Sequence, residues 1–183
     1  MRTYEQTHPW LTFRWEPRRL TYPVWLLLGE AAAYIQVIQR AALPPAAAHA
    51  LEKEALVKGL HALAALEGNS LNEQQVAQGL AGELKLSPSQ SYLGQEIQNL
   101  FKAVRWTEDR ARAGDRQFSP WSLQLLNAQV LKGLPWDEET SPGEYRSERQ
   151  HQGAHGGAPA EDISYLVERL CEWGEEVSNN AIE

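Results

Sequence analysis

The seven residues LAALEGN, from Leu63 to Asn69, are the most informative stretch for the fold and function of this chain. They mark the end of a long helix, because glycine is favoured just beyond a helix C-terminus. The last turn of a helix carries partial negative charge and favours Lys, Arg or His. Glu67 places a carboxylate there and so breaks a local rule.

The spacing of the residues before Glu67 adds a second anomaly. Leu56, Leu60, Leu63 and Glu67 are spaced i, i+4, i+7 and i+11, so Glu67 continues the apolar stripe of its own helix. A carboxylate on a buried face needs a cationic partner or a polar pocket. Glu67 is therefore a candidate functional residue. One alternative stays open, in which the helix end frays and Glu67 turns into solvent.

Two helices are predicted upstream of this stretch. The nearer one runs from about Ala46 to Leu66, roughly 30 Å at the usual rise per residue. The earlier one begins at Thr21, a favoured cap, and ends before Pro44-Pro45. Two adjacent apolar stripes predict that this earlier helix belongs to the core. Its stripes are Leu27, Ala31, Tyr34 and Ile38, and Trp25, Leu28, Ala32 and Ile35.

Helix starts are also predicted downstream. Ser70 and Glu73 have the spacing of a capping box, and Ser87-Pro88 and Ser119-Pro120 are further N-terminal signals. A last helix is expected from Ile163 to Trp173. Pro135 to Pro159 is nearly free of aliphatic residues and predicts a long loop, with a short hairpin between Gly143 and Gly157. Because convincing alternating strands are absent from the sequence, the expected class is mostly α.

Composition narrows the functional classes. The chain has 183 residues, 43% hydrophobic, with one cysteine and a net charge of −7. A single cysteine excludes an internal disulfide framework and favours a reducing compartment, and burial is expected for Cys171. The acidic balance argues against a nucleic-acid partner. Val24 to Ile38 is the most apolar window, but Glu30 and Gln36 interrupt it, so no membrane span is expected. Without a secretory signal at the N-terminus, a cytoplasmic protein is expected.

The sequence contains none of the usual catalytic or metal-binding motifs. There is no glycine-rich phosphate loop, no C-x-x-C and no H-E-x-x-H. His151 and His155 are four residues apart but lack further ligands, so no metal site is predicted. From the residues alone, the chain is a helical domain with an anomalous carboxylate and a long polar loop.

Three segments, in this order, resemble the Fic (Fido) family, whose members mostly transfer AMP from ATP to protein hydroxyls. Leu66 to Leu71 resembles the S-S-x-I-E-G-N-x-L segment that precedes the Fic catalytic core. Pro142 to Arg146 resembles the G-x-Y-R that opens the Fic flap, and Ala158-Pro159 with the helix from Ile163 resembles the helix after that flap. Trp10 to Trp15 also looks like the start of the helical domain that often precedes Fic cores.

The resemblance implies a mostly α, multi-helix Fic-like domain with a short β-hairpin flap. Residues 1–115 would form an N-terminal helical domain with the inhibitory helix, and residues 116–183 would begin the Fic core. In the family the glutamate of the E-G segment pairs with the second arginine of the catalytic motif and obstructs the ATP γ-phosphate. That inhibitory role would fall on Glu67, followed by Gly68 and Asn69. The flap, here Gly143, Tyr145 and Arg146, would hold target backbone by strand addition.

The chain also departs from the family pattern. Leu63 and Ala64 stand where the family has serines, Gln150 and Gln152 where the flap has valine-like residues, and Asn127 where a histidine is frequent. The motif H-x-F-x-[D/E]-G-N-G-R-x-x-R does not occur before Glu183. The resemblance therefore implies a truncated form with no catalytic residue of its own, inactive alone. ATP and Mg would be needed only by a full-length protein.

Two functional hypotheses remain. The first is the regulatory, flap-bearing part of an autoinhibited Fic adenylyltransferase, whose partners are the missing C-terminal catalytic segment and a protein substrate. The alternative is a non-enzymatic, antitoxin-like helical module that inserts Glu67 into a partner's active site in trans. A helical domain with accidental similarity is a third option, and a homodimer is left open. In the truncated form that the resemblance implies, Glu67 is expected to be solvent-exposed or to have a substitute partner.

Overall fold

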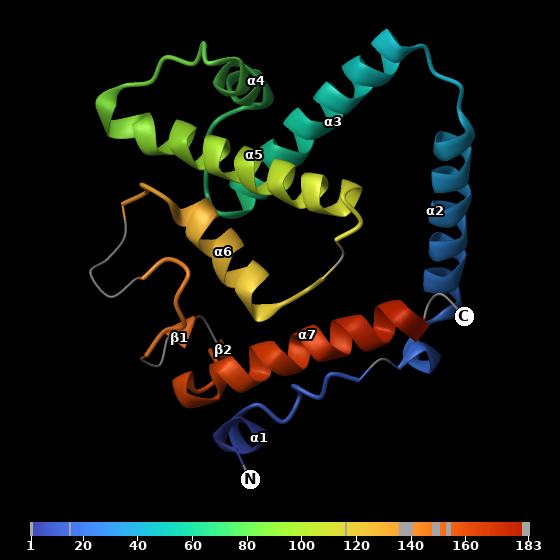
Figure 1. Ribbon diagram of the computed structural model, residues 1–183, viewed down its shortest axis with the longest axis vertical. Coiled ribbons are helices and arrows are strands. Elements are labelled where there is room, and N and C mark those ends of the chain that lie inside the picture. Colours follow the sequence, from blue (N-terminus) through green and yellow to red (C-terminus); the bar gives the residue numbers. More distant parts are fainter. Residues whose placement is uncertain are drawn as a thin grey trace. The chain divides into compact units, whose positions relative to one another are not determined.

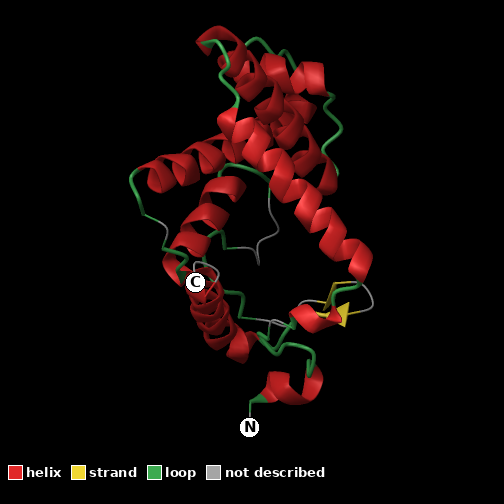
Figure 2. Cartoon of the chain, turned by 90° about the vertical axis from the view of Figure 1, so that its right-hand side faces the viewer, coloured by secondary structure: helices red, strands yellow, loops and turns green. Residues whose placement is uncertain are grey.

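The computed structural model describes residues 2–14, 16–115, 117–135, 141–147, 151–152 and 155–180. The chain divides into two compact units. The larger comprises Met1–Phe13 and Val57–Glu183, and the smaller is Arg14–Leu56. Helix predominates over the described residues, with one two-stranded hairpin (Figure 2). The predicted mostly α class is confirmed, and the predicted division at residues 115 and 116 stays a prediction.

The smaller unit contains α2 (Tyr22–Arg40) and the first part of α3 (Pro45–Leu66). Thr21 precedes α2 in extended conformation, as predicted, and Pro23 lies in the first turn of the helix. The prediction that α2 is a core helix is wrong, because none of its residues is buried. No described element of this unit packs extensively against α2, so its two apolar stripes stay exposed.

The larger unit has its core where α3, α4 (Glu73–Ala81) and α5 (Ser91–Arg112) supply buried apolar side chains. Helix α5 packs against α4 and against α6 (Pro120–Leu131), and it lies between them (Figure 1). The most deeply buried apolar residues are Leu60, Val76 and Ile97. Leu93 and Ile97, four residues apart on α5, give that helix its inward stripe.

The buried row of α3 differs from the predicted stripe. Val57, Leu60 and Ala64 are buried, whereas Leu63 is 47% exposed. The buried row follows the spacing i, i+3, i+7, which lies to one side of the predicted row through Leu56, Leu60 and Leu63. Because Leu60 belongs to both rows, the spacing of apolar residues in α3 does not by itself distinguish the two faces. The prediction that Glu67 lies on a buried face is therefore wrong.

One of the predicted helix starts differs in detail. Asn72, not Ser70, caps α4: its side chain accepts a hydrogen bond from the Gln75 backbone N–H, and Gln75 accepts one from the Asn72 backbone N–H. An Asn-x-x-Gln box satisfies the same backbone groups as the predicted Ser-x-x-Glu box, two residues later. At α6, Ser119 is the cap, as predicted, with Pro120 as the first helical residue.

Further described elements follow α6 in the chain. Strands β1 (His151–Gln152) and β2 (His155–Gly156) pair antiparallel, with His151 opposite Gly156. The short 3₁₀ helix η3 (Ala160–Asp162) leads into α7 (Ile163–Asn180). Cys171 on α7 is buried, as predicted. Among the described residues, no helix is long and apolar enough to span a membrane.

Candidate functional site

The end of α3 has the hydrogen bonds of a Schellman motif. Gly68 has a φ of +88°, its N–H donates to Ala65 O at 3.1 Å, and the Asn69 N–H donates to Ala64 O at 3.0 Å. These two bonds satisfy carbonyls that would otherwise be unpaired at the helix end. A Cβ on Gly68 would meet nothing within 4 Å, so the backbone angle, not crowding, favours glycine.

Glu67 is the last residue before this left-handed turn. Its side chain is exposed, and it makes no side-chain hydrogen bond or ion pair with any residue that the structure describes. The motif fixes the backbone of Glu67, because the Glu67 N–H also donates to Ala64 O at 3.1 Å. The carboxylate is therefore held on an ordered backbone and is directed away from the buried face of α3.

Asn69 anchors the turn to α5. It is 7% exposed, and its side-chain amide donates to Leu93 O at 3.1 Å and to Glu96 Oε2 at 2.9 Å. Its Oδ1 accepts from the Leu71 N–H at 3.0 Å. Buried polar groups that are fully paired in this way fix a single local arrangement. The predicted segment thus divides into an outward carboxylate, a turn and an anchor.

The first residue of the predicted flap is seated on α6. Gly143 has a φ of +85°, and its N–H donates to Asn127 Oδ1 at 2.8 Å. A Cβ at Gly143 would lie 3.0 Å from Ala128 Cβ and 3.2 Å from Gln124 O. Both the backbone angle and the close approach therefore require glycine here. Asn127 therefore contacts Gly143, the first residue of the predicted flap, directly.

The next flap residues turn towards α7 and the far end of the hairpin. Tyr145 is half-buried, and burial, followed by Cys171 and Glu168 on α7, raises the pKa of its phenol above the ordinary value. Arg146 Nη2 donates to Ala158 O, which joins the residues before β1 to those after β2. The buried Arg146 Nε has no hydrogen-bond partner among the described residues.

The described residues do not assemble a metal site. No group of three or more His, Cys, Asp or Glu residues within them is placed to hold a metal ion. The side chains of His151, Gln152 and His155 lie outside the described part of the chain, as does Gln150. Glu67 makes no hydrogen bond or ion pair with the described flap residues, so the two predicted parts are each ordered locally but are not joined directly.

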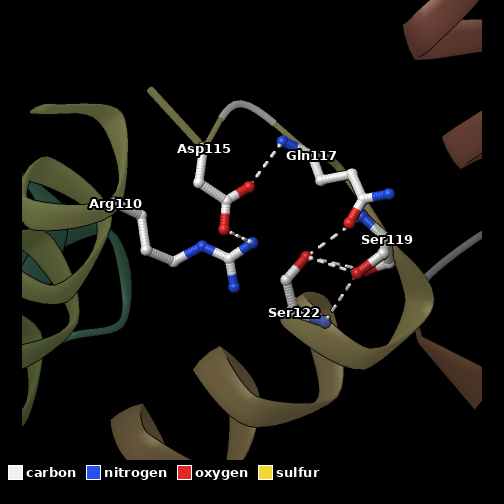
Figure 3. A network of polar contacts seen from close by, with 5 residues as sticks. All are labelled: Arg110, Asp115, Gln117, Ser119 and Ser122. Carbon is white, nitrogen blue, oxygen red and sulfur yellow. Dashed lines mark hydrogen bonds and ion pairs between the residues drawn. The ribbon is translucent and has the colours of Figure 1, made fainter. Parts of the chain in front are cut away.

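A cavity lies elsewhere, between the loop after α5 and the second half of α7. Its volume is about 540 Å³, and its lining includes Phe118 and Glu175. Beside it, Arg110 pairs with Asp115 at 2.6 Å, and Asp115 accepts from the Gln117 N–H (Figure 3). The Gln117 bond and then Arg110 lower the pKa of Asp115. This polar network links Arg110, near the end of α5, to Asp115 and Gln117.

Sequence reasoning missed Asn99. This residue is fully buried on α5, and its amide donates to Val130 O at 2.9 Å and to Lys132 O at 2.7 Å. It thereby satisfies carbonyls at the C-terminus of α6, and Gln95 donates to its Oδ1. The sequence contains only a weak signal for this residue. Asparagine is intrinsically unfavourable inside a long amphipathic helix, so its presence there indicates a compensating side-chain contact.

Comparisons with known proteins show a likeness of fold. No protein-family model and no curated protein matches the chain. A crystal structure of a Fic family protein from Desulfovibrio desulfuricans G20 matches with a TM-score of 0.64 and 22% sequence identity. The match covers 88% of this chain and 48% of that chain, so this chain spans about half the length of the structure that it resembles. The chain therefore has a Fic-like fold.

Proposed function

We propose that this chain is the regulatory and flap-bearing part of a Fic-type adenylyltransferase that is autoinhibited by Glu67. In the reaction, a protein hydroxyl oxygen attacks the α-phosphorus of ATP, the bond to the β-phosphate oxygen breaks, and pyrophosphate leaves. The hydroxyl proton passes to a base. Base, metal ligand and phosphate-binding groups would come from a catalytic segment other than residues 1–183.

The observation that carries this proposal is the exposed carboxylate of Glu67 on an ordered helix end. An acidic residue in a mobile tail would lose backbone conformational freedom on pairing with an arginine. The backbone of Glu67 is already fixed by the Schellman motif and by Asn69, so this cost is small. Such a carboxylate can form a bidentate pair with an incoming arginine. The pair would occupy a guanidinium needed for the ATP triphosphate, and the carboxylate would also repel the γ-phosphate.

The flap half of the proposal is supported by how its start is held. Gly143 is fixed to α6, and Arg146 connects the two ends of the hairpin. A hairpin supported at both ends presents its strand edges in a defined place, which suits docking of an extended target segment. Gly143, Tyr145 and Arg146 would position the flap and would not take part in the chemistry.

The same exposed carboxylate supports a second candidate, inhibition in trans. Because Glu67 lacks a described partner in its own chain, it is as available to an arginine of a separate catalytic protein as to one of a longer chain. The location of the catalytic motif distinguishes the two candidates. Inhibition in cis requires the motif in the same polypeptide, whereas inhibition in trans requires binding to a separate core.

The test uses ATP labelled at the α-phosphate. It compares the 183-residue chain with a longer polypeptide that contains residues 1–183 together with any segment that the gene encodes after Glu183. We expect label transfer to protein only from a polypeptide that contains H-x-F-x-[D/E]-G-N-G-R-x-x-R, and weak ATP binding by residues 1–183 alone. Tight ATP binding by residues 1–183, or a gene without that motif, would contradict the cis proposal. A catalytic-core fragment retained by the wild-type chain but not by Glu67→Gln would then support the trans candidate.

A further inference from the structure

The first residues of the chain contact the far end of the flap, although they are about 150 positions away in sequence. We call residues 2–8 the N-terminal strap. They include α1 (Thr3–Thr7), which lies beside the start of α7 (Figure 1). The strap belongs to the same compact unit as the hairpin and α7.

One end of the strap is attached to Asp162, at the end of η3. Asp162 is 3% exposed, accepts from the Tyr4 N–H at 2.7 Å and pairs with Arg2 at 3.3 Å. The Arg2 guanidinium also lies 3.8 Å from the centre of the Tyr165 ring, in cation–π geometry. A buried carboxylate with a charged partner and a backbone donor is a strong local attachment.

The other end of the strap reaches strand β2. His8 is 6% exposed, and its Nε2 lies 2.8 Å from Gly156 O. A carbonyl can only accept, so Nε2 carries the proton in this bond. His8 Nδ1 contacts Thr7 Oγ1 at 2.7 Å, which fixes the ring from its other side. The imidazole therefore joins the strap to the backbone of the hairpin.

The strap is ordered by these attachments and not by its own stability. An isolated helix shorter than about 12 residues is marginal in water, and α1 has 5 residues, none of them buried. Its conformation therefore depends on Asp162 and Gly156. The dependence is mutual, since β1 and β2 are two residues each and a short hairpin alone is also marginal.

We propose that the N-terminal strap is a positioning element of the flap, in which His8 holds strand β2 and Asp162 holds the strap against α7. Loss of either attachment leaves the hairpin without its outer support. The strap would act in this way whether or not the protein transfers AMP. Only its consequence, that the strap influences how a target segment docks, rests on the proposed function.

Hydrogen exchange of the 183-residue chain tests the proposal. His8→Leu removes the donor to Gly156 O, and His8→Gln keeps an N–H donor at nearly the same place. We expect His8→Leu to speed exchange of the amides from 151 to 158 by roughly 2- to 10-fold, as losing one hydrogen bond implies. Exchange in His8→Gln should stay near the wild-type rate. Gln6→Ala, a change at an exposed position of the N-terminal strap, is the matched control.

A second variant tests whether an effect on the hairpin is transmitted through the strap or arises only from the lost contact at His8. Asp162→Ala should speed exchange in residues 3–8 and also in 151–158, because the attachments act through one segment. The unfolding transition of each variant shows whether the whole unit remains folded. Unchanged exchange in 151–158 for both His8→Leu and Asp162→Ala would overturn the proposal. Equal exchange in His8→Leu and His8→Gln would overturn the role of the His8 hydrogen bond.

Discussion

The buried amide of Asn69 donates a hydrogen bond of 2.9 Å to the Glu96 carboxylate, and so connects the turn after Glu67 to α5. The same amide donates to Leu93 O, so one side chain satisfies two acceptors on the neighbouring helix. Glu67 and Asn69 are two residues apart but have opposite environments, one exposed and one buried. The anchor is what allows the exposed carboxylate to occupy a defined position.

Asn69→Ala should destabilise the larger unit by about 2–3 kcal/mol, because it removes the bonds to Leu93 O and Glu96 and leaves the Leu71 N–H without its partner. Urea unfolding followed by circular dichroism measures this change. Asn69→Asp keeps the acceptor for the Leu71 N–H but opposes the Glu96 carboxylate, so it should be at least as destabilising at neutral pH. Ser70→Ala, at an exposed neighbouring position, should change the stability by less than about 0.5 kcal/mol.

Gly143→Ala and Gly68→Ala form a matched pair. Both positions have a positive φ, +85° and +88°, so both alanines carry the backbone cost of about 1–2 kcal/mol. Only the Cβ at position 143 would also be crowded, at 3.0 Å from Ala128 Cβ. Gly143→Ala should therefore cost about 1 kcal/mol or more beyond Gly68→Ala. Equal losses of stability in the two variants would show that the flap is not seated against α6 in this way.

Asn99→Ala should weaken the packing of α6 on α5. The change removes both donors to the α6 C-terminus and leaves Val130 O and Lys132 O without the amide that pairs them in a partly buried place. We expect a loss of about 2–3 kcal/mol. Hydrogen exchange should also rise in residues 120–132 more than in α4. Asn72→Ala, which removes a solvent-exposed cap, provides a comparison of about 1 kcal/mol.

The raised pKa of Tyr145 predicts that the free energy of unfolding falls at alkaline pH. Its pKa is raised above the ordinary value of 10.0, first by burial and then by Cys171 and Glu168. The folded state therefore keeps the phenol proton where the unfolded state begins to lose it. This contribution is fully present below about pH 10 and is lost as the pH rises through the folded pKa. Tyr145→Phe should flatten the dependence of the unfolding free energy on pH above about 10, and a parallel curve for wild type and variant would contradict this expectation.

The elements that the sequence predicted correctly are those with a local cause. Gly68 ends α3 and Ser119 starts α6 because cap residues act within a few positions. Burial was predicted less well: α2 has a strong apolar pattern but no covering element among the described residues of its unit. The contacts of Asp162 with Arg2 and Tyr4 span about 160 residues, and no local pattern indicates them. Long-range polar contacts of this kind are set by tertiary structure.

The most direct test of the proposed autoinhibition measures AMP transfer by the polypeptide that carries both this chain and the catalytic motif. Glu67→Gly and Glu67→Gln should each raise the initial rate roughly 10- to 100-fold, because the charge-assisted pair that they remove contributes about 1.5–3 kcal/mol. Glu73→Gln, an exposed acidic residue on the neighbouring helix, should leave the rate unchanged. An unchanged rate in both Glu67 variants would contradict the inhibitory role of Glu67.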